Sequence, residues 1–188
     1  MTETPSDSAA KAELVALIRE HGLLEAGDFE LAAGAHVSTY IDLRRVSMHP
    51  DGATLIGRML APRLAARGIT AVGGMATAAI PVVTAVVMAS AGTAHPLRGF
   101  YVRDKAKTRG TQRQIEGQLQ PGDKVALLED TMTTGGSTMT AVEAVRAEGC
   151  EVVQVLTVVD RQQGGAALYA EAGIPFDALV TLDDITGG

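Results

Sequence analysis

Residues 125–137 constrain the fold of this chain more than any other stretch. Four apolar residues, beginning at Val125, are followed by the acids Glu129 and Asp130 and then by a loop rich in Thr, Gly and Ser. An apolar run of this kind is typical of a strand buried on both faces of a parallel sheet. Open α/β sheets bind their ligands at the carboxyl ends of such strands. The stretch therefore predicts a ligand site at the edge of an α/β sheet.

The loop at 131–137 carries the groups that bind a phosphate. Its hydroxyls, its unhindered backbone N–H groups and the helix N-terminus that follows all favour an anion. The sequence contains neither a P-loop nor the glycine pattern of a dinucleotide site. A purely structural turn is the alternative, but two adjacent carboxylates at a strand end are costly to bury unless something binds them. Because the acids suit sugar hydroxyls, we expect a sugar phosphate here.

Predicted strands alternate with predicted helices along most of the chain. We expect helices at 8–21, 51–67, 78–90, 137–149 and 165–172, strands at 38–44, 69–74, 98–103, 124–130, 151–160 and 177–182, and an irregular polar stretch at 104–117. This alternation predicts an α/β fold with a doubly wound, mostly parallel sheet. Residues 1–45 do not fit it. We expect them to form an N-terminal helix and a small hood over the ligand edge, with 46–188 as the core of the same single domain.

The composition excludes several classes of function. The 188 residues are enough for one domain, and a net charge of −6 argues against a nucleic-acid partner. No apolar run approaches the length of a membrane span, and the N-terminus has no secretory signal pattern. The single cysteine, Cys150, cannot form an internal disulfide, so the default expectation is a cytoplasmic protein. The four histidines are scattered and predict no metal site.

A second candidate site is the basic segment 103–113, which holds five basic residues and one acid in an otherwise acidic protein. Four of its cations recur at every second position: Arg103, Lys105, Lys107 and Arg109. In an extended chain they project to one face, where they would attract a polyanion such as pyrophosphate. A solvated charged hairpin is the alternative. The glycine and the polar composition favour a lid that closes over a ligand.

Two shorter segments also follow predicted strands. Asp160 and Arg161 come directly after an apolar run, and an arginine there can hold a carboxylate or planar carbonyl groups; a surface turn is the alternative. Gly73 and Gly74 end another strand, before Met75. Paired glycines allow close approach of the backbone to a ligand, although tight packing of helix on strand explains them nearly as well.

These four segments, in this order, resemble the type I phosphoribosyltransferases. Residues 125–137 look like the phosphoribosyl-pyrophosphate signature of that family. Within the family the chain is most similar to the members that act on orotate. The matching segments are a hood (Phe29-x-Leu31-x-x-Gly34 and Ser38-x-Tyr40-x-Asp42-Leu43-Arg44), a pyrophosphate loop (Gly73-Gly74 to Pro81), a catalytic loop (Val102-Arg103 to Gly117) and an orotate-binding segment (Val158 to Gly165).

The resemblance implies an enzyme that converts orotate and phosphoribosyl pyrophosphate into orotidine 5′-phosphate and pyrophosphate, a step of UMP synthesis, with Mg²⁺ held through the substrate and no protein ligand to it. It implies catalytic roles for Lys107, Arg103 and Asp130, with Thr133 and Arg161 binding orotate and Gly74, Met75, Ala76 and Thr77 forming the pyrophosphate loop. The donor would be bound by Arg103, Lys107, Arg109, Glu129, Asp130, Thr131, Met132, Thr133, Thr134, Gly135, Gly136 and Ser137. The implied assembly is a homodimer with active sites at the interface, into which Arg103 reaches.

The sequence departs from the family pattern mainly in the basic segment. The family usually has Lys at the position of Asp104, Glu at that of Lys105 and His at that of Arg109. The cation is therefore lost at position 104, while Arg109 keeps a cationic donor at its position. Two alternatives stay open: a phosphoribosyltransferase for another base, and a non-catalytic regulator that binds phosphoribosyl pyrophosphate. Arg161 discriminates the first alternative, because a purine presents no carboxylate to it.

Overall fold

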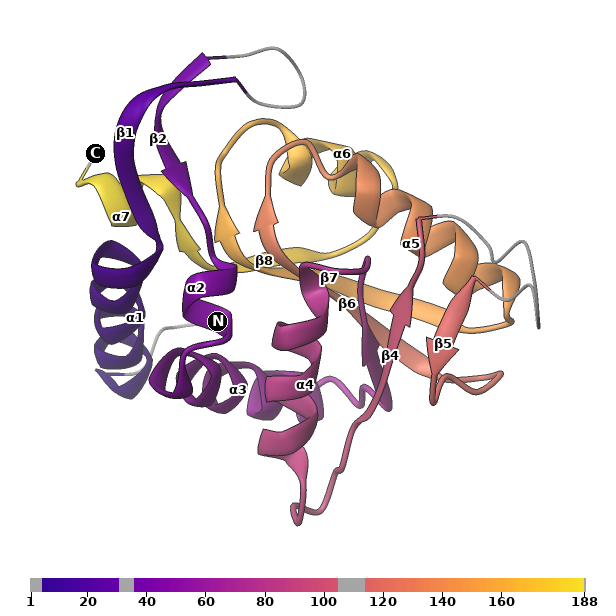
Figure 1. The fold of residues 1–188 in the computed structure, drawn as a ribbon. Coiled ribbons are helices and arrows are strands. Elements are labelled where there is room, and N and C mark those ends of the chain that lie inside the picture. The colour runs from indigo at the N-terminus through magenta and orange to yellow at the C-terminus, as the bar shows by residue number, and fades with distance from the viewer. Residues whose placement is uncertain (1–4, 31–35, 105–113, 188) are drawn as a thin grey trace.

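The computed structural model describes residues 5–30, 36–104 and 114–187 and shows a six-stranded sheet with helices on both faces (Figure 1). The strands are β1 (Leu23–Glu30), β2 (His36–Ile41), β3 (Ala71–Gly73), β4 (Arg98–Val102), β5 (Ile115–Gly117), β6 (Lys124–Met132), β7 (Glu151–Asp160) and β8 (Phe176–Thr181). The helices are α1 (Pro5–Leu17), the π-helical η1 (Ile18–Gly22), α2 (Arg44–Ser47), α3 (Pro50–Ala65), α4 (Ala79–Ser90), α5 (Gly136–Ala147), α6 (Gly165–Glu171) and α7 (Leu182–Thr186).

The main sheet has the strand order β5-β4-β3-β6-β7-β8. All neighbouring pairs are parallel except β4 and β5, which pair antiparallel at one edge. The expected α/β fold with a doubly wound, mostly parallel sheet is therefore confirmed. From β3 the chain proceeds to one side as β4 and later to the other side as β6, β7 and β8. The pair β3 and β6 thus forms the topological switch point, the usual place for a ligand in such a sheet.

Strand β6 shows why both faces of the sheet are covered. Ala126 and Leu128 lie in an apolar cluster with α1, α3 and α4, whereas Val125 and Leu127 lie in a second cluster with α5 and α6. Successive side chains of a strand point to opposite faces, so an uninterrupted apolar run needs two covering layers. Figure 1 shows these layers, with α1, α3 and α4 on one side and α5 and α6 on the other.

The hood is the antiparallel hairpin of β1 and β2, which rises beyond the edge of the main sheet in Figure 1. Its base is tied to the chain by the Asp42 N–H, which donates to the Gly22 carbonyl oxygen over 2.9 Å. Helix α1 contributes Leu14, and η1, which leads into the hairpin, contributes Ile18 to the apolar cluster that also includes side chains of α3 and α4. The division into 1–45 and 46–188 stays a prediction.

Four parts of the expected secondary structure were wrong. Strand β1 (Leu23–Glu30) was missed. The predicted strand at 38–44 ends at Ile41, and α2 follows, because Leu43 and Val46 are both buried at a spacing of three residues. The predicted irregular stretch 104–117 ends in β5, whose three residues have no apolar pattern and form a strand by pairing with β4. Helix α7 was missed, although Thr181 and Asp184 form a capping box at its start.

None of the helices in the described parts of the chain is long and apolar enough to cross a membrane.

Candidate active site

The carboxyl ends of four strands bring to one edge of the sheet three of the segments singled out in the sequence and the first two residues of the basic segment, Arg103 and Asp104. Strand β6 lies between β3 and β7, with Met132 paired to Asp160. The Arg161 N–H donates to the Met132 carbonyl oxygen over 2.9 Å. On the other side, the N–H of Val102 at the end of β4 donates to the Gly74 carbonyl oxygen over 2.9 Å. The described parts of these segments therefore lie side by side along one edge of the sheet.

The acid Glu129 ties the loop after β6 to helix α5. One of its carboxylate oxygens accepts from the Ser137 hydroxyl over 3.2 Å, and the other accepts from the Thr138 hydroxyl over 2.8 Å. Burial raises the pKa of Glu129, and the two hydroxyl donors oppose that rise in part. These two hydrogen bonds join the end of β6 to the first turn of α5, and so hold the N-terminus of α5 at the edge of the sheet.

The second acid, Asp130, faces the same edge. Its Oδ1 atom accepts from the Thr131 N–H over 2.7 Å. Burial raises the pKa of Asp130, while the Thr131 N–H and the charge of Arg44 act to lower it. Arg44 is held by Asp42 at the base of the hood, with 2.8 Å between its Nε and the carboxylate. The site therefore has a half-buried carboxylate beside a phosphate-type loop.

Tyr169 of α6 contacts the loop after β6 through Gly135. Its role was not predicted from the sequence. This α6 side chain is fully buried, and its hydroxyl donates to the Gly135 carbonyl oxygen over 3.3 Å. Gly135 has φ of 79°, and a Cβ there would lie 2.8 Å from the tyrosine oxygen, so only glycine fits. Burial, with the charge of Glu129 adding to it, raises the pKa of Tyr169 to about 12, so its hydroxyl keeps its proton. The only signal in the sequence was an aromatic residue on the helix predicted at 165–172.

Arg161 is a buried cation at the end of β7. The side chain is 7% exposed, and its Nε has no hydrogen-bond partner among the described residues. It takes part in none of the ion pairs found in the described parts of the chain. A buried charge without a partner is costly, which points to an anionic ligand. Two further buried atoms near this edge, the Thr131 hydroxyl and the Nε of Arg103, also have no partner among these residues.

The segment after β3 lies against the neighbouring strands. A Cβ at Gly74 would lie 2.1 Å from the Leu128 carbonyl oxygen, so close packing requires this glycine. Met75 bridges to Val102. A hollow of about 460 Å³ opens beside this segment and is lined by Ala76, Thr77, Ile80, Tyr101, Arg103 and Asp104. Its lining carries one cation, Arg103, and one acid, Asp104.

The remaining predicted site residues fall into two groups. Met132 is fully buried, Gly135 is buried and Thr133 is half-buried. Thr134 in the loop and Gly136 and Ser137 at the start of α5 are exposed. Lys107 and Arg109 lie outside the described residues, as do Lys105 and Gly34.

Comparisons with known proteins agree with this arrangement. The orotate phosphoribosyltransferase of Rhodopirellula baltica is 43% identical over 187 residues, which cover 95% of this chain and 96% of that protein. The chain belongs to the orotate phosphoribosyltransferase family. The family's enzyme from Corynebacterium glutamicum is 40% identical over 185 residues and 98% of each chain. No protein-family model matches the sequence.

Solved structures extend the likeness to the orotate phosphoribosyltransferase fold. The enzyme of Mycobacterium tuberculosis H37Rv, solved in complex with phosphoribosyl pyrophosphate, superposes with a TM-score of 0.79 at 35% identity, covering 94% of this chain and 99% of that one. A phosphoribosyltransferase from Corynebacterium diphtheriae gives a TM-score of 0.83 at 37% identity, over 95% and 99% of the two chains. The fold around the candidate site is therefore that of the orotate phosphoribosyltransferases.

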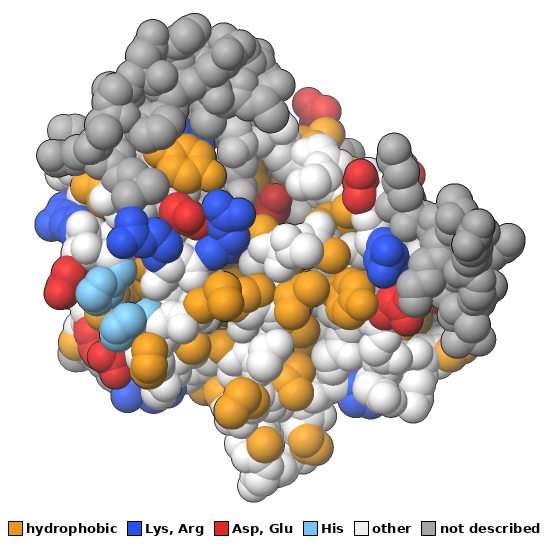
Figure 2. Space-filling model, viewed as in Figure 1, with side chains coloured by type: hydrophobic (Ala, Val, Ile, Leu, Met, Phe, Trp, Pro, Cys, Tyr) orange, Lys and Arg blue, Asp and Glu red, His pale blue; other side chains and the backbone are white. Residues whose placement is uncertain are grey.

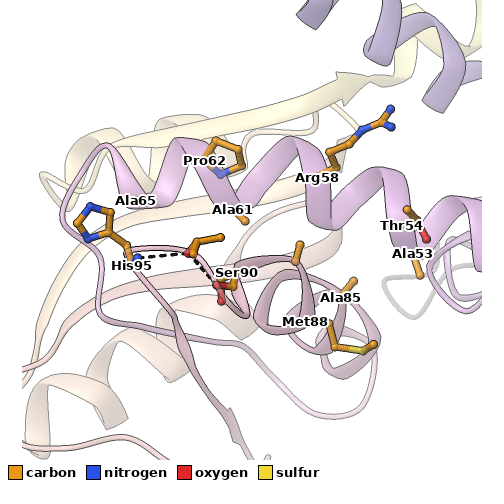
Figure 3. A pocket seen from close by; sticks show the side chains of 12 residues that line it. Ala53, Thr54, Arg58, Ala61, Pro62, Ala65, Ala85, Met88, Ser90 and His95 are labelled. Atoms are coloured by element: carbon orange, nitrogen blue, oxygen red, sulfur yellow. Dashed lines mark hydrogen bonds between the residues drawn. The ribbon is translucent and has the colours of Figure 1, made fainter.

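A larger hollow, of about 620 Å³, lies away from this edge between α3 and α4 (Figure 3). Alanines and Pro62 of α3 face Ala85 and Met88 of α4 across it. Figure 2 shows apolar side chains gathered over the same two helices. The described residues that line this groove include no acid and one arginine, Arg58, so it offers little to a sugar phosphate.

Proposed function

We propose that this chain transfers the 5-phosphoribosyl group from phosphoribosyl pyrophosphate to orotate, giving orotidine 5′-phosphate and pyrophosphate. The observation that carries this proposal is Arg161, a buried cation without a partner among the described residues, beside a phosphate-type loop. Orotate carries a carboxylate, which a guanidinium can hold through two hydrogen bonds. Thr133 lies on the loop next to that strand end and would contact the same base. The relatives named as orotate phosphoribosyltransferases support this acceptor over a purine.

The donor would occupy the loop at 131–137 and the acids before it. The backbone N–H groups at the start of α5 would bind the 5-phosphate. Asp130 would accept hydrogen bonds from the ribose hydroxyls. Glu129 would add to them, because a carboxylate has about four acceptor positions and only two are occupied by Ser137 and Thr138. The leaving pyrophosphate would lie near Gly74 to Thr77 and the basic segment.

The chemistry needs positioning and charge more than a protein nucleophile. The bond from ribose C1 to the pyrophosphate oxygen breaks and leaves an oxocarbenium-like centre. A nitrogen of the orotate anion donates its electron pair to that carbon. Arg103 and Lys107 would stabilise the negative charge that builds on the pyrophosphate. Asp130 would hold the ribose in line and balance the positive charge on the sugar.

Magnesium fits these residues as an ion carried by the substrate. No group of three or more His, Cys, Asp or Glu side chains able to hold a metal is found among the described residues. Asp130 offers one carboxylate at the edge, and Mg²⁺ commonly uses one or two carboxylates together with substrate phosphates and water. When bound, the ion would neutralise charge on the pyrophosphate.

An orotate-dependent absorbance assay with Mg²⁺ and phosphoribosyl pyrophosphate tests the proposed function. We expect turnover with orotate and little or none with uracil, adenine, guanine or hypoxanthine. Turnover with one of those bases but not with orotate would favour the alternative acceptor. Donor binding without turnover of any base would favour the regulator.

The cytoplasmic location stays a prediction from the sequence.

The pKa of Asp130 predicts how donor affinity changes with pH. A carboxylate accepts from both ribose hydroxyls, so affinity falls as pH drops through the pKa that burial has raised. The donor phosphates also titrate, so the Kd of the wild type is compared with that of Asp130→Asn at each pH by calorimetry. We expect the wild type to bind the donor more tightly than Asp130→Asn, with the full difference in Kd near pH 8. As pH falls, this difference should begin to shrink at a higher pH than it would for an ordinary aspartate, whose pKa is about 3.9. An advantage that shrinks only in the pH range where an ordinary aspartate titrates would contradict this prediction.

We also propose a homodimer in which Arg103 acts on the partner's site, and subunit mixing tests it. Arg103→Ala and Asp130→Asn should each be nearly inactive alone. If Arg103 acts across the interface, each mixed dimer has one site with both residues intact, so an equal mixture regains about a quarter of wild-type activity after subunit exchange. If Arg103 acts within its own subunit, mixing regains nothing. Light scattering on the wild type checks that dimers form.

A further inference from the structure

The turn after β7 has an unusual backbone conformation. Gln162 has φ of 58°, and it is the one residue other than glycine with a positive φ among the residues that the structure describes. A glutamine is strained in this left-handed region, which glycine occupies freely. Gln162 directly follows Arg161, so its conformation sets the direction in which the chain leaves the buried arginine. Surrounding contacts must hold it there.

Those contacts come from both sides of the turn. The Gln162 N–H donates to Oδ1 of Asp160 over 2.7 Å. Its side-chain amide makes a reciprocal pair with Asp183 of α7: Nε2 donates to the carboxylate over 3.0 Å, and Oε1 accepts from the Asp183 N–H over 3.3 Å. Asp160 is itself 8% exposed and lies at the end of β7. The turn is thus fastened to the strand before it and to the C-terminal helix.

Helix α7 is a firm support rather than a loose chain end. Thr181, its N-cap, pairs with Asp160 in the sheet and forms a capping box with Asp184. Lys11 of α1 forms an ion pair with Asp184 over 2.9 Å. Arg19 donates to the Ile185 carbonyl oxygen over 2.6 Å. These contacts fix α7 against the sheet and the N-terminal helix, so Asp183 holds Gln162 from a fixed position.

We propose that Asp183 and Gln162 are positioning residues that hold Arg161 in the direction needed to bind the orotate carboxylate. This inference rests on the proposed function. Neither side chain would touch the substrate; both act through the backbone of the turn. Because the Arg161 N–H is already bonded to Met132 on the β6 side, the Gln162–Asp183 pair supplies the second restraint. Its loss would leave the arginine in place but spread over several orientations.

Steady-state kinetics of Asp183→Ala, Gln162→Ala and the double variant test the proposal. We expect each single variant to raise the KM for orotate by about 3- to 10-fold, as for the loss of one hydrogen bond, with the KM for phosphoribosyl pyrophosphate and kcat within about twofold. The double variant should have an orotate KM no higher than that of the single variant with the larger increase, because both residues act through one contact. Asp183→Asn should recover most of the affinity, since its carbonyl oxygen still accepts from Gln162. Glu171→Ala, which removes an exposed acid on α6, is the matched control.

Three results would overturn the inference. Unchanged orotate KM in both single variants would show that the pair is an ordinary surface contact. A proportional rise in the KM of both substrates, with a lowered Tm, would show a general structural role. Multiplying effects in the double variant would show that the residues do not act through each other. Absence of orotate turnover by the wild type would instead overturn the proposed function, which keeps the two failures distinct.

Discussion

Replacing Arg161 by Ala should raise the KM for orotate by about 100-fold, or about 2.7 kcal/mol, which is the cost of removing one partner from a buried charged pair. The donor sites at Asp130 and at the loop 131–137 are untouched by this change. The affinity for phosphoribosyl pyrophosphate should therefore stay near the wild-type value. Initial rates at varied orotate, together with calorimetry of donor binding, measure the two effects separately.

Two further variants sharpen the test of Arg161. Arg161→Lys keeps the charge but loses the planar fork, so we expect it to recover only part of the affinity. Arg146→Ala removes an exposed arginine from α5 and should leave both substrates unaffected. Equal loss of affinity for orotate and for the donor in Arg161→Ala would refute the assignment of this residue to the acceptor.

Lys107→Ala should lower kcat by about 100- to 1000-fold, the usual effect of removing one charge that stabilises a transition state. The negative charge on pyrophosphate is greatest as it leaves, so the lysine acts more strongly in the transition state than on the bound donor. The Kd of the donor should therefore rise far less than kcat falls. Single-turnover kinetics and equilibrium binding give the two quantities.

Lys124→Ala is the matched control for this lysine, because Lys124 is exposed at the amino end of β6, on the opposite edge of the sheet. It should leave kcat and donor affinity unchanged. If Lys107→Ala keeps the wild-type rate, the lysine is a solvated residue of the basic segment, and the charge on pyrophosphate is met by other groups. A loss of donor affinity as large as the loss of rate would mean that Lys107 binds the ground state and the transition state equally.

Local pattern was enough to predict the strand and loop at the centre of the site. The apolar run from Val125 and the acids after it predicted a buried strand, and β6 covers it. The same reasoning placed Arg161 directly after a strand, and β7 ends at Asp160. These features depend on periodicity and on where parallel strands end, both of which can be read from neighbouring residues.

The supports of the site could not be predicted in the same way. The hydroxyl of Tyr169 contacts Gly135, which is 34 positions away, and Gln162 contacts Asp183 across 21 positions. Such contacts follow from sheet register and helix docking, which no local pattern encodes. The two hydrogen bonds that Glu129 accepts from Ser137 and Thr138 were not predicted, for a different reason: the acid was interpreted only as a group that binds the sugar.

The backbone hydrogen bonds between the ends of β3 and β4 order the residues that would contact the leaving pyrophosphate. Val102 donates to Gly74, and Ala76 donates back to Val102 over 2.8 Å, so the turn after β3 and the stem of the basic segment form one small rigid unit. The turn that leads to Thr77 and the start of the basic segment at Arg103 are therefore held to each other by the fold, while in the proposed dimer they serve the sites of two different subunits. The cost of ordering them falls on folding rather than on each catalytic cycle.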